Sequence, residues 1–150
     1  MNKRTIITAL LAILTMVVSA QAVDSTSVKP EFPGGEKGLS KYLKKNVKYP
    51  ELAEEYHIEG KVIMHFIVDT DGSVKDITAS DCTIDRFKTT RFSQETEARQ
   101  TQLKEQFALL FAKEGARVIK KMPKWKPAML NGEKVKARYN LTIRFLDPNN

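Results

Sequence analysis

This chain of 150 residues has little of what most catalytic and metal-binding sites use. It has one cysteine, Cys82, and two histidines, His57 and His65, and none of them forms the short motifs of a zinc site or of a nucleophile beside its base. No glycine-rich phosphate loop follows a predicted strand, and the carboxylates are scattered over predicted loops and helix surfaces. We therefore expect no enzyme, no metal and no cofactor; a Cys–His pair formed by folding is the alternative.

Long hydrophobic runs are absent except at the N-terminus. There, Lys3 and Arg4 precede an apolar run from Ile6 to Val18, and Ser19-Ala20-Gln21-Ala22 supplies the small residues that a signal peptidase accepts. The run is shorter than the ~20 residues that a membrane-spanning helix needs. We predict a signal peptide over residues 1–22, with an uncleaved membrane anchor as the alternative.

An exported chain with a single cysteine has no internal disulfide, so packing must stabilise the fold. Cys82 is then either a small buried residue or a link between two chains. The net charge is +7, and residues 113–144 hold ten Lys and Arg against two Glu. This basic end suits an acidic partner, an anionic lipid surface or an anionic wall polymer. Nucleic acid fits poorly, because the chain has one Trp and no recognised nucleic-acid motif.

Hydrophobic periodicity predicts the order helix, short helix, strand, strand, helix, strand. The two helices are expected at Glu36–Asn46 and Glu51–His57, and the two strands at Lys61–Val68 and Val74–Ser80. Residues 81–92 are predicted to be irregular. A long helix capped by Ser93 should then run to Pro123 with a break near Gly115. This order predicts an α+β domain with one antiparallel sheet and helices on one face.

The stretch from Lys134 to Phe145 alternates without a break and predicts one long strand of roughly 36–40 Å. Its polar face consists of Lys134, Lys136, Arg138, Asn140, Thr142 and Arg144. A long strand near a chain end is expected at a sheet edge, where unpaired N–H and C=O groups accept another strand. The alternative interpretation of the basic face is a solvated, charged edge that prevents aggregation.

Several short motifs occur together in a fixed order. They are Phe32-Pro33-Gly34-Gly35, Asn46, Tyr49-Pro50, Ala53, Ile58-Glu59-Gly60-Lys61-Val62, Phe66-Ile67-Val68, Asp71-Gly72-Ser73-Val74 and Met122-Pro123-Lys124-Trp125-Lys126-Pro127. With these motifs, about residues 30–146 resemble the C-terminal domain of the energy transducer TonB. The Gly-Gly pair and the Met-Pro-x-Trp-x-Pro segment resemble one branch of that family.

The resemblance implies a three-stranded antiparallel sheet and a periplasmic, non-enzymatic role in outer-membrane transport. The expected partner is an extended peptide of the TonB-box type, from TonB-dependent outer-membrane receptors, or another periplasmic protein segment. The peptide would add as a strand to the edge formed by residues 133–145. Asn46, Val47 and Lys48, just before the Tyr-Pro pair, would also contact it.

The chain departs from the family in two places. The segment from Thr5 to Val18 lacks the His of the family's membrane anchor, and the polar lead over residues 23–31 is far shorter than a periplasm-crossing stalk. In the domain itself, expected at residues 32–146 with a tail at 147–150, about residues 81–106 form a charged insertion. The alternative function is therefore a repurposed periplasmic homodimer or scaffold without energy transduction. A third hypothesis is a periplasmic enzyme or enzyme regulator that uses the inserted segment.

Overall fold

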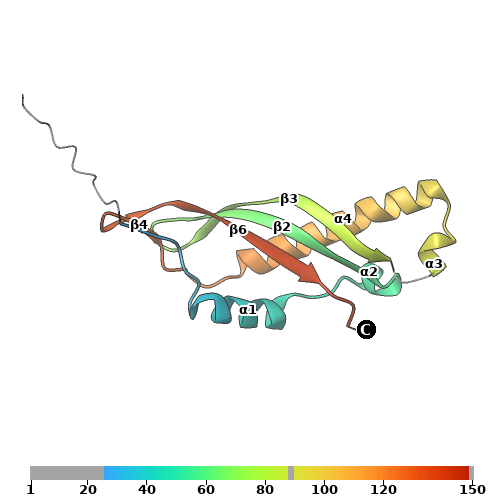
Figure 1. The fold of residues 1–150 in the computed structure, drawn as a ribbon, viewed down its shortest axis with the longest axis horizontal. Coiled ribbons are helices and arrows are strands. Elements are labelled where there is room, and N and C mark those ends of the chain that lie inside the picture. The colour runs from blue at the N-terminus through green and yellow to red at the C-terminus, as the bar shows by residue number, and fades with distance from the viewer. Residues whose placement is uncertain (1–25, 88–89, 149–150) are drawn as a thin grey trace, which may run out of the picture.

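A computed structural model describes residues 26–87 and 90–148, so the predicted signal peptide lies outside the described residues (Figure 1). The centre of the fold is an antiparallel sheet of three strands in the order β3-β2-β6. The strands are β2 (Ile58–Val68), β3 (Val74–Phe87) and β6 (Ala137–Phe145). The sheet packs against the long helix α4 (Glu97–Lys120), which confirms the α+β class.

The remaining elements surround this sheet. Helix α1 (Gly35–Asn46) is joined to α4 by a hydrogen bond of 2.9 Å from the Tyr42 hydroxyl to the Val118 carbonyl. Short helices α2 (Glu51–Glu55) and α3 (Thr90–Ser93) lie at one end of the molecule (Figure 1). At the other end, a second sheet has the order β1-β4-β5 and consists of β1 (Ser27–Val28), β4 (Ala128–Leu130) and β5 (Glu133–Val135). The predicted polar lead therefore includes a strand.

Strand β2 is the middle strand and follows the predicted alternation. Its buried face carries Val62, Met64, Phe66 and Val68, as the sequence predicts. It begins at Ile58 rather than at Lys61, and α2 correspondingly ends earlier than predicted. Ile58 is fully buried, and His57 just before it has a φ of 51°, so the chain changes from helix to strand within two residues.

The prediction that residues 81–92 are irregular is wrong, because β3 continues to Phe87. Its pairing with β2 shifts register at three places, and at each place β3 holds more residues than β2. Such bulges break a period of two, so alternation cannot be followed along the sequence. Cys82 and Ile84, which pair opposite Val62 and Gly60, still pack against the core.

Helix α4 is continuous, so the predicted break near Gly115 and the predicted cap at Ser93 are both wrong. Thr96 caps the helix, and its side chain accepts a hydrogen bond of 3.3 Å from the backbone N–H of Arg99. A Cβ at position 115 would lie 2.9 Å from Met64 Sδ. The glycine therefore permits close contact between α4 and β2 instead of interrupting the helix.

The predicted strand from Lys134 to Phe145 is divided into two strands at Lys136. β5 pairs with β4 after a turn at Asn131 and Gly132, whose φ angles are 50° and 82°, whereas β6 pairs with β2. The phase of the alternation is confirmed. Along β6, Leu141, Ile143 and Phe145 are buried, and the polar positions between them are exposed.

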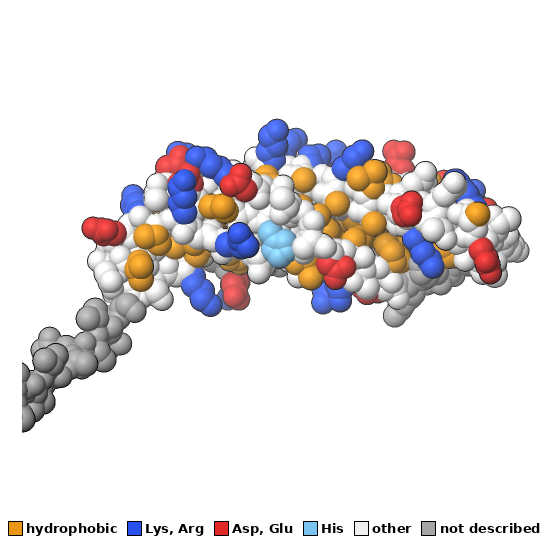
Figure 2. Space-filling model, turned by 90° about the horizontal axis from the view of Figure 1, so that it is seen from above, with side chains coloured by type: hydrophobic (Ala, Val, Ile, Leu, Met, Phe, Trp, Pro, Cys, Tyr) orange, Lys and Arg blue, Asp and Glu red, His pale blue; other side chains and the backbone are white. Residues whose placement is uncertain are grey.

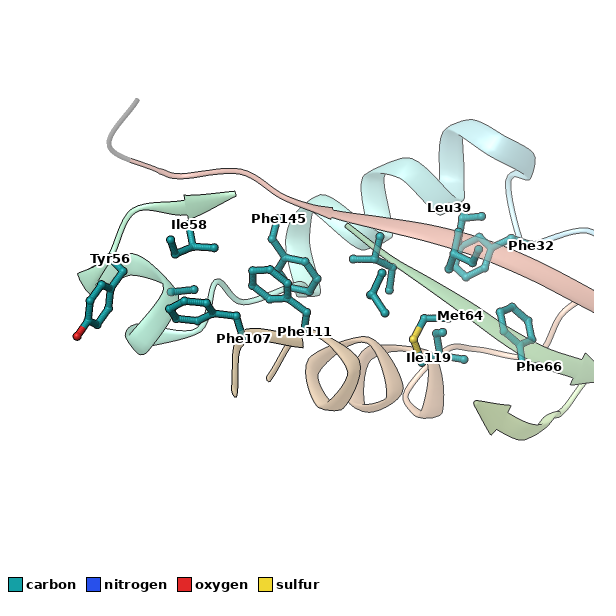
Figure 3. Close-up of a cluster of buried hydrophobic side chains, with 14 of the residues drawn as sticks. Phe32, Leu39, Tyr56, Ile58, Met64, Phe66, Phe107, Phe111, Ile119 and Phe145 are labelled. Atoms are coloured by element: carbon teal, nitrogen blue, oxygen red, sulfur yellow. The ribbon is translucent and has the colours of Figure 1, made fainter. Parts of the chain in front are cut away.

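Aromatic side chains hold α4 to the sheet. The rings of Phe111 and Phe145 stack with centroids 4.1 Å apart, and Figure 3 shows them facing each other between the helix and the strands. Nearer the small sheet, the Trp125 ring meets Phe66 and Tyr139 at 5.5 Å and 4.8 Å. Because both clusters include β6 side chains, the core fixes the position of this strand at the edge of the sheet.

Candidate functional site

The outer edge of β6 is the most regular strand edge that the structure describes. On its inner side, β6 is joined to β2 by nine consecutive residue pairs, from Gly60–Phe145 to Val68–Ala137, without a register shift. Among the described strands, β6 has no neighbour on its other side. The outer edge of β3 is interrupted by bulges, and Asp76 there has a φ of 51°. Bulges discourage edge pairing, so β6 is the edge better suited to accept a further strand.

A groove of about 670 Å³ lies between α1 and this edge. Its apolar lining comes from Leu39 and Leu43 of α1, from Val47 and Tyr49, and from Tyr139, Ile143, Phe145 and Leu146. Its polar lining comes from Glu36, Ser40, Lys44, Thr142 and Arg144. Residues of both faces of β6 line it, as is expected of a groove that runs beside a strand edge. Its volume is in the range of ~300–1,000 Å³ of typical ligand pockets.

Of the predicted contact segment Asn46–Val47–Lys48, Val47 lines the groove and Asn46 and Lys48 do not, and hydrogen bonds to α4 hold the segment in place. The Asn46 carbonyl accepts a hydrogen bond of 2.7 Å from Arg117 Nη2. The Lys48 backbone N–H donates one of 2.7 Å to Glu114 Oε1. Both backbone groups are therefore directed to α4, whereas Val47 between them lines the groove.

The two side chains of α4 are also bonded to each other. Arg117 donates from Nε and Nη2 to the two carboxylate oxygens of Glu114, at 2.8 Å and 2.6 Å. Burial by itself would raise the pKa of Glu114, but the hydrogen bonds from Arg117 and Lys48 lower it overall. The carboxylate of Glu114 in turn raises the pKa of Arg117. Both groups are thus charged at neutral pH.

Tyr49 anchors the next part of the wall. Its hydroxyl donates toward the carbonyls of Ala53, at 3.2 Å, and Ile58. Burial, and then the nearby carboxylates of Asp147 and Glu59, raise the pKa of Tyr49. The phenol therefore stays protonated and keeps its role as a donor, while its ring lines the groove.

The structure distributes the predicted edge-strand residues over different places. Thr142 and Arg144 line the groove, and Arg138 and Asn140 line a second hollow of about 430 Å³ between β6 and the small sheet. Lys134 belongs to β5, where it pairs with Met129, and Lys136 lies between the two strands. All six side chains are exposed.

Most of the groove lining was not predicted as a site. Leu39, Leu43 and Tyr139 have the spacing of core residues, and periodicity does not distinguish a side chain under a neighbouring element from one beside an open edge. The face in Figure 2 carries Lys and Arg interspersed with Asp and Glu, with apolar side chains between them. The described residues on that face therefore form no patch of a single charge.

The reactive side chains have structural neighbours. Burial, and then Asp81 and Asp85, raise the pKa of the Cys82 thiol, which disfavours a nucleophilic thiolate. His57 Nδ1 lies 2.7 Å from Asp147 Oδ2, and His65 Nδ1 lies 2.6 Å from Asn140 Oδ1. Within residues 26–87 and 90–148, no group of three or more His, Cys, Asp or Glu side chains is placed to hold a metal. None of the helices described there is long and apolar enough to cross a membrane.

Comparison with known proteins gives one family. Residues 45–89, from the end of α1 through β3, match the family model described as Gram-negative bacterial TonB protein C-terminal. Two NMR solution structures of the Helicobacter pylori TonB-CTD are similar. The longer one is 17% identical, with a TM-score of 0.41, and the match covers 72% of this chain and 76% of that one. The shorter one is 16% identical, with a TM-score of 0.41, and the match covers 76% and 95%. No curated protein matches this chain.

Proposed function

We propose that this chain, in which residues 45–89 match the TonB C-terminal family model, binds an extended peptide segment by adding it as a strand to the outer edge of β6. The observation that carries the proposal is the combination of a regular edge, which has no neighbour among the described strands, with the groove beside it. Backbone hydrogen bonds along β6 supply affinity for many sequences, and pockets for alternate side chains supply preference.

The groove favours a particular peptide chemistry. An added strand directs alternate side chains to opposite faces. Those facing the groove meet Leu43, Val47 and Tyr139, so they are expected to be apolar. Those on the other face lie near Arg138, which is exposed and suits acidic residues. A peptide that alternates apolar and acidic residues fits both faces.

The proposed source of the peptide is the TonB-box segment of a TonB-dependent outer-membrane receptor, reached in the periplasm. The alternative is a homodimer or scaffold in which two copies pair through β6. Such a pairing would bring two basic strand faces together, and like charges across a strand pair are unfavourable. We therefore place peptide binding first.

In-cell photo-crosslinking from position 142 tests the proposal. Thr142 is exposed and lines the groove, and Lys113 on the outer side of α4 is an exposed control position. Capture of outer-membrane receptors from position 142, and not from position 113, is the expected result. Capture of the chain itself from position 142 would instead favour the homodimer, and equal capture from both positions would refute a site at the β6 edge.

A further inference from the structure

Glu114 and Arg117 are charged residues one turn apart on α4. They contact the segment around Val47 on the side away from the groove. Together they make hydrogen bonds to backbone groups on both sides of Val47: Arg117 donates to the Asn46 carbonyl and Glu114 accepts from the Lys48 N–H, each at 2.7 Å. We call this pair the α4 bracket. Its side chains are 12% and 35% exposed, so solvent competes little for Glu114.

The bracket supplies hydrogen-bond partners at the C-terminal end of α1. The last carbonyls of a helix have no partner within the helix, and a cation near them is favourable. Arg117 supplies that cation at Asn46, the last residue of α1. After it the chain becomes extended, with Val47 at φ −72° and ψ 125°, and its N–H still donates to the Leu43 carbonyl at 2.9 Å. The backbone is thus hydrogen-bonded at three successive residues, Asn46, Val47 and Lys48.

We propose that Glu114 and Arg117 are positioning residues for the peptide site: they keep Val47 in place before the peptide arrives. The inference rests on the proposed function. Ordering a loop during binding reduces affinity, and a wall that is already ordered avoids that loss. The two residues do not line the groove themselves, so they act through the segment they hold.

The variants Glu114→Ala and Arg117→Met remove one half of the bracket each. Arg117→Met keeps an apolar stem of similar length, and Arg117→Lys keeps the charge but not the two-pronged contact with Glu114. Lys113→Ala is the matched control, because Lys113 is an exposed residue of the same helix. Circular dichroism establishes that each variant is folded.

Two measurements test the inference. In the free protein, hydrogen exchange of the Lys48 amide should become faster by about tenfold or more in Glu114→Ala, because the bracketed N–H loses its acceptor. In calorimetric titration with a synthetic octapeptide of alternating valine and glutamate, Glu114→Ala and Arg117→Met should bind about tenfold more weakly. Arg117→Lys should be intermediate, and Lys113→Ala should equal the wild type.

The outcomes separate the two proposals. If the wild type does not bind the octapeptide, the proposed function fails in this form, and with it the role of the bracket in binding. If the wild type binds and both bracket variants bind within twofold of it, only the positioning role is overturned. Unchanged exchange of the Lys48 amide in Glu114→Ala would also overturn it, whatever the titration shows.

Discussion

Replacing Gly115 with alanine tests how closely α4 packs on the sheet. A Cβ at this position would lie 2.9 Å from Met64 Sδ, 3.2 Å from Met64 Cγ and 3.5 Å from Ile143 Cδ1. Met64 is 1% exposed and Ile143 is 2% exposed, so both side chains are buried in the core. The methyl group therefore has to displace packed atoms.

Two opposing effects set the size of the change. Glycine in the middle of a helix is less favourable than alanine by ~1 kcal/mol, so the substitution gains that amount locally. Overpacking a filled core typically costs about 1–3 kcal/mol. We expect the cost of overpacking to exceed the gain in helix propensity, so the free energy of unfolding should decrease by about 1 kcal/mol.

Urea denaturation followed by circular dichroism measures this difference. The double-mutant cycle with Met64→Ala gives the control. Met64→Ala alone should lower the free energy of unfolding by about 2–5 kcal/mol. In the Gly115→Ala background the same substitution should lower it by less, because the new methyl group occupies part of the vacated space. If Gly115→Ala instead stabilised the protein by ~1 kcal/mol, as at an exposed helix position, the close contact between α4 and β2 would be refuted.

Two further predictions concern the sheet and its turn. Leu141→Asp should unfold the domain, because it buries an unpaired charge at a position that is 8% exposed. Thr142→Asp, at an exposed position, should leave the domain folded. If circular dichroism showed Thr142→Asp to be unfolded, the assigned strand phase would be contradicted. The hydrogen bond from Lys75, and then that from the Thr70 N–H, lower the pKa of Asp69 to about 2. Ionised Asp69 therefore stabilises the fold above its ordinary pKa of 3.8, and this contribution is lost as the pH falls towards 2. Asp69→Asn should show a smaller decrease in stability between about pH 5 and about pH 2 by urea titration, and an unchanged decrease would contradict the assignment.

Local pattern was enough to predict the faces of the regular elements. The alternation in β2 and β6 identifies the buried side chains correctly, because the period of a strand depends only on the backbone of that strand. The turn at Asn131 and Gly132 is also a local feature, because both residues tolerate a positive φ. Neither inference requires knowledge of a distant part of the chain.

Sequence periodicity predicted the secondary structure wrongly where contact with another element determines it. The bulges of β3 depend on its fit to β2, so the continuation to Phe87 is not visible in its own sequence. Gly115 is read as a helix breaker by local propensity, yet its role is contact with Met64 from another element. The division of the last strand at Lys136 follows from pairing with two different sheets.

The candidate site shows the same division. The sequence by itself determined which side chains of β6 are apolar or polar. It also showed the resemblance to the TonB family, and through it the expectation that residues 46–48 contact a peptide. Only the tertiary structure decided that β6 is an edge strand among the described residues, that a groove lies between it and α1, and that Glu114 and Arg117 form hydrogen bonds to the backbone on both sides of Val47. The physical reason is that periodicity and turn chemistry act over a few residues, whereas an edge, a groove and a bracket exist only between segments that are distant in the chain.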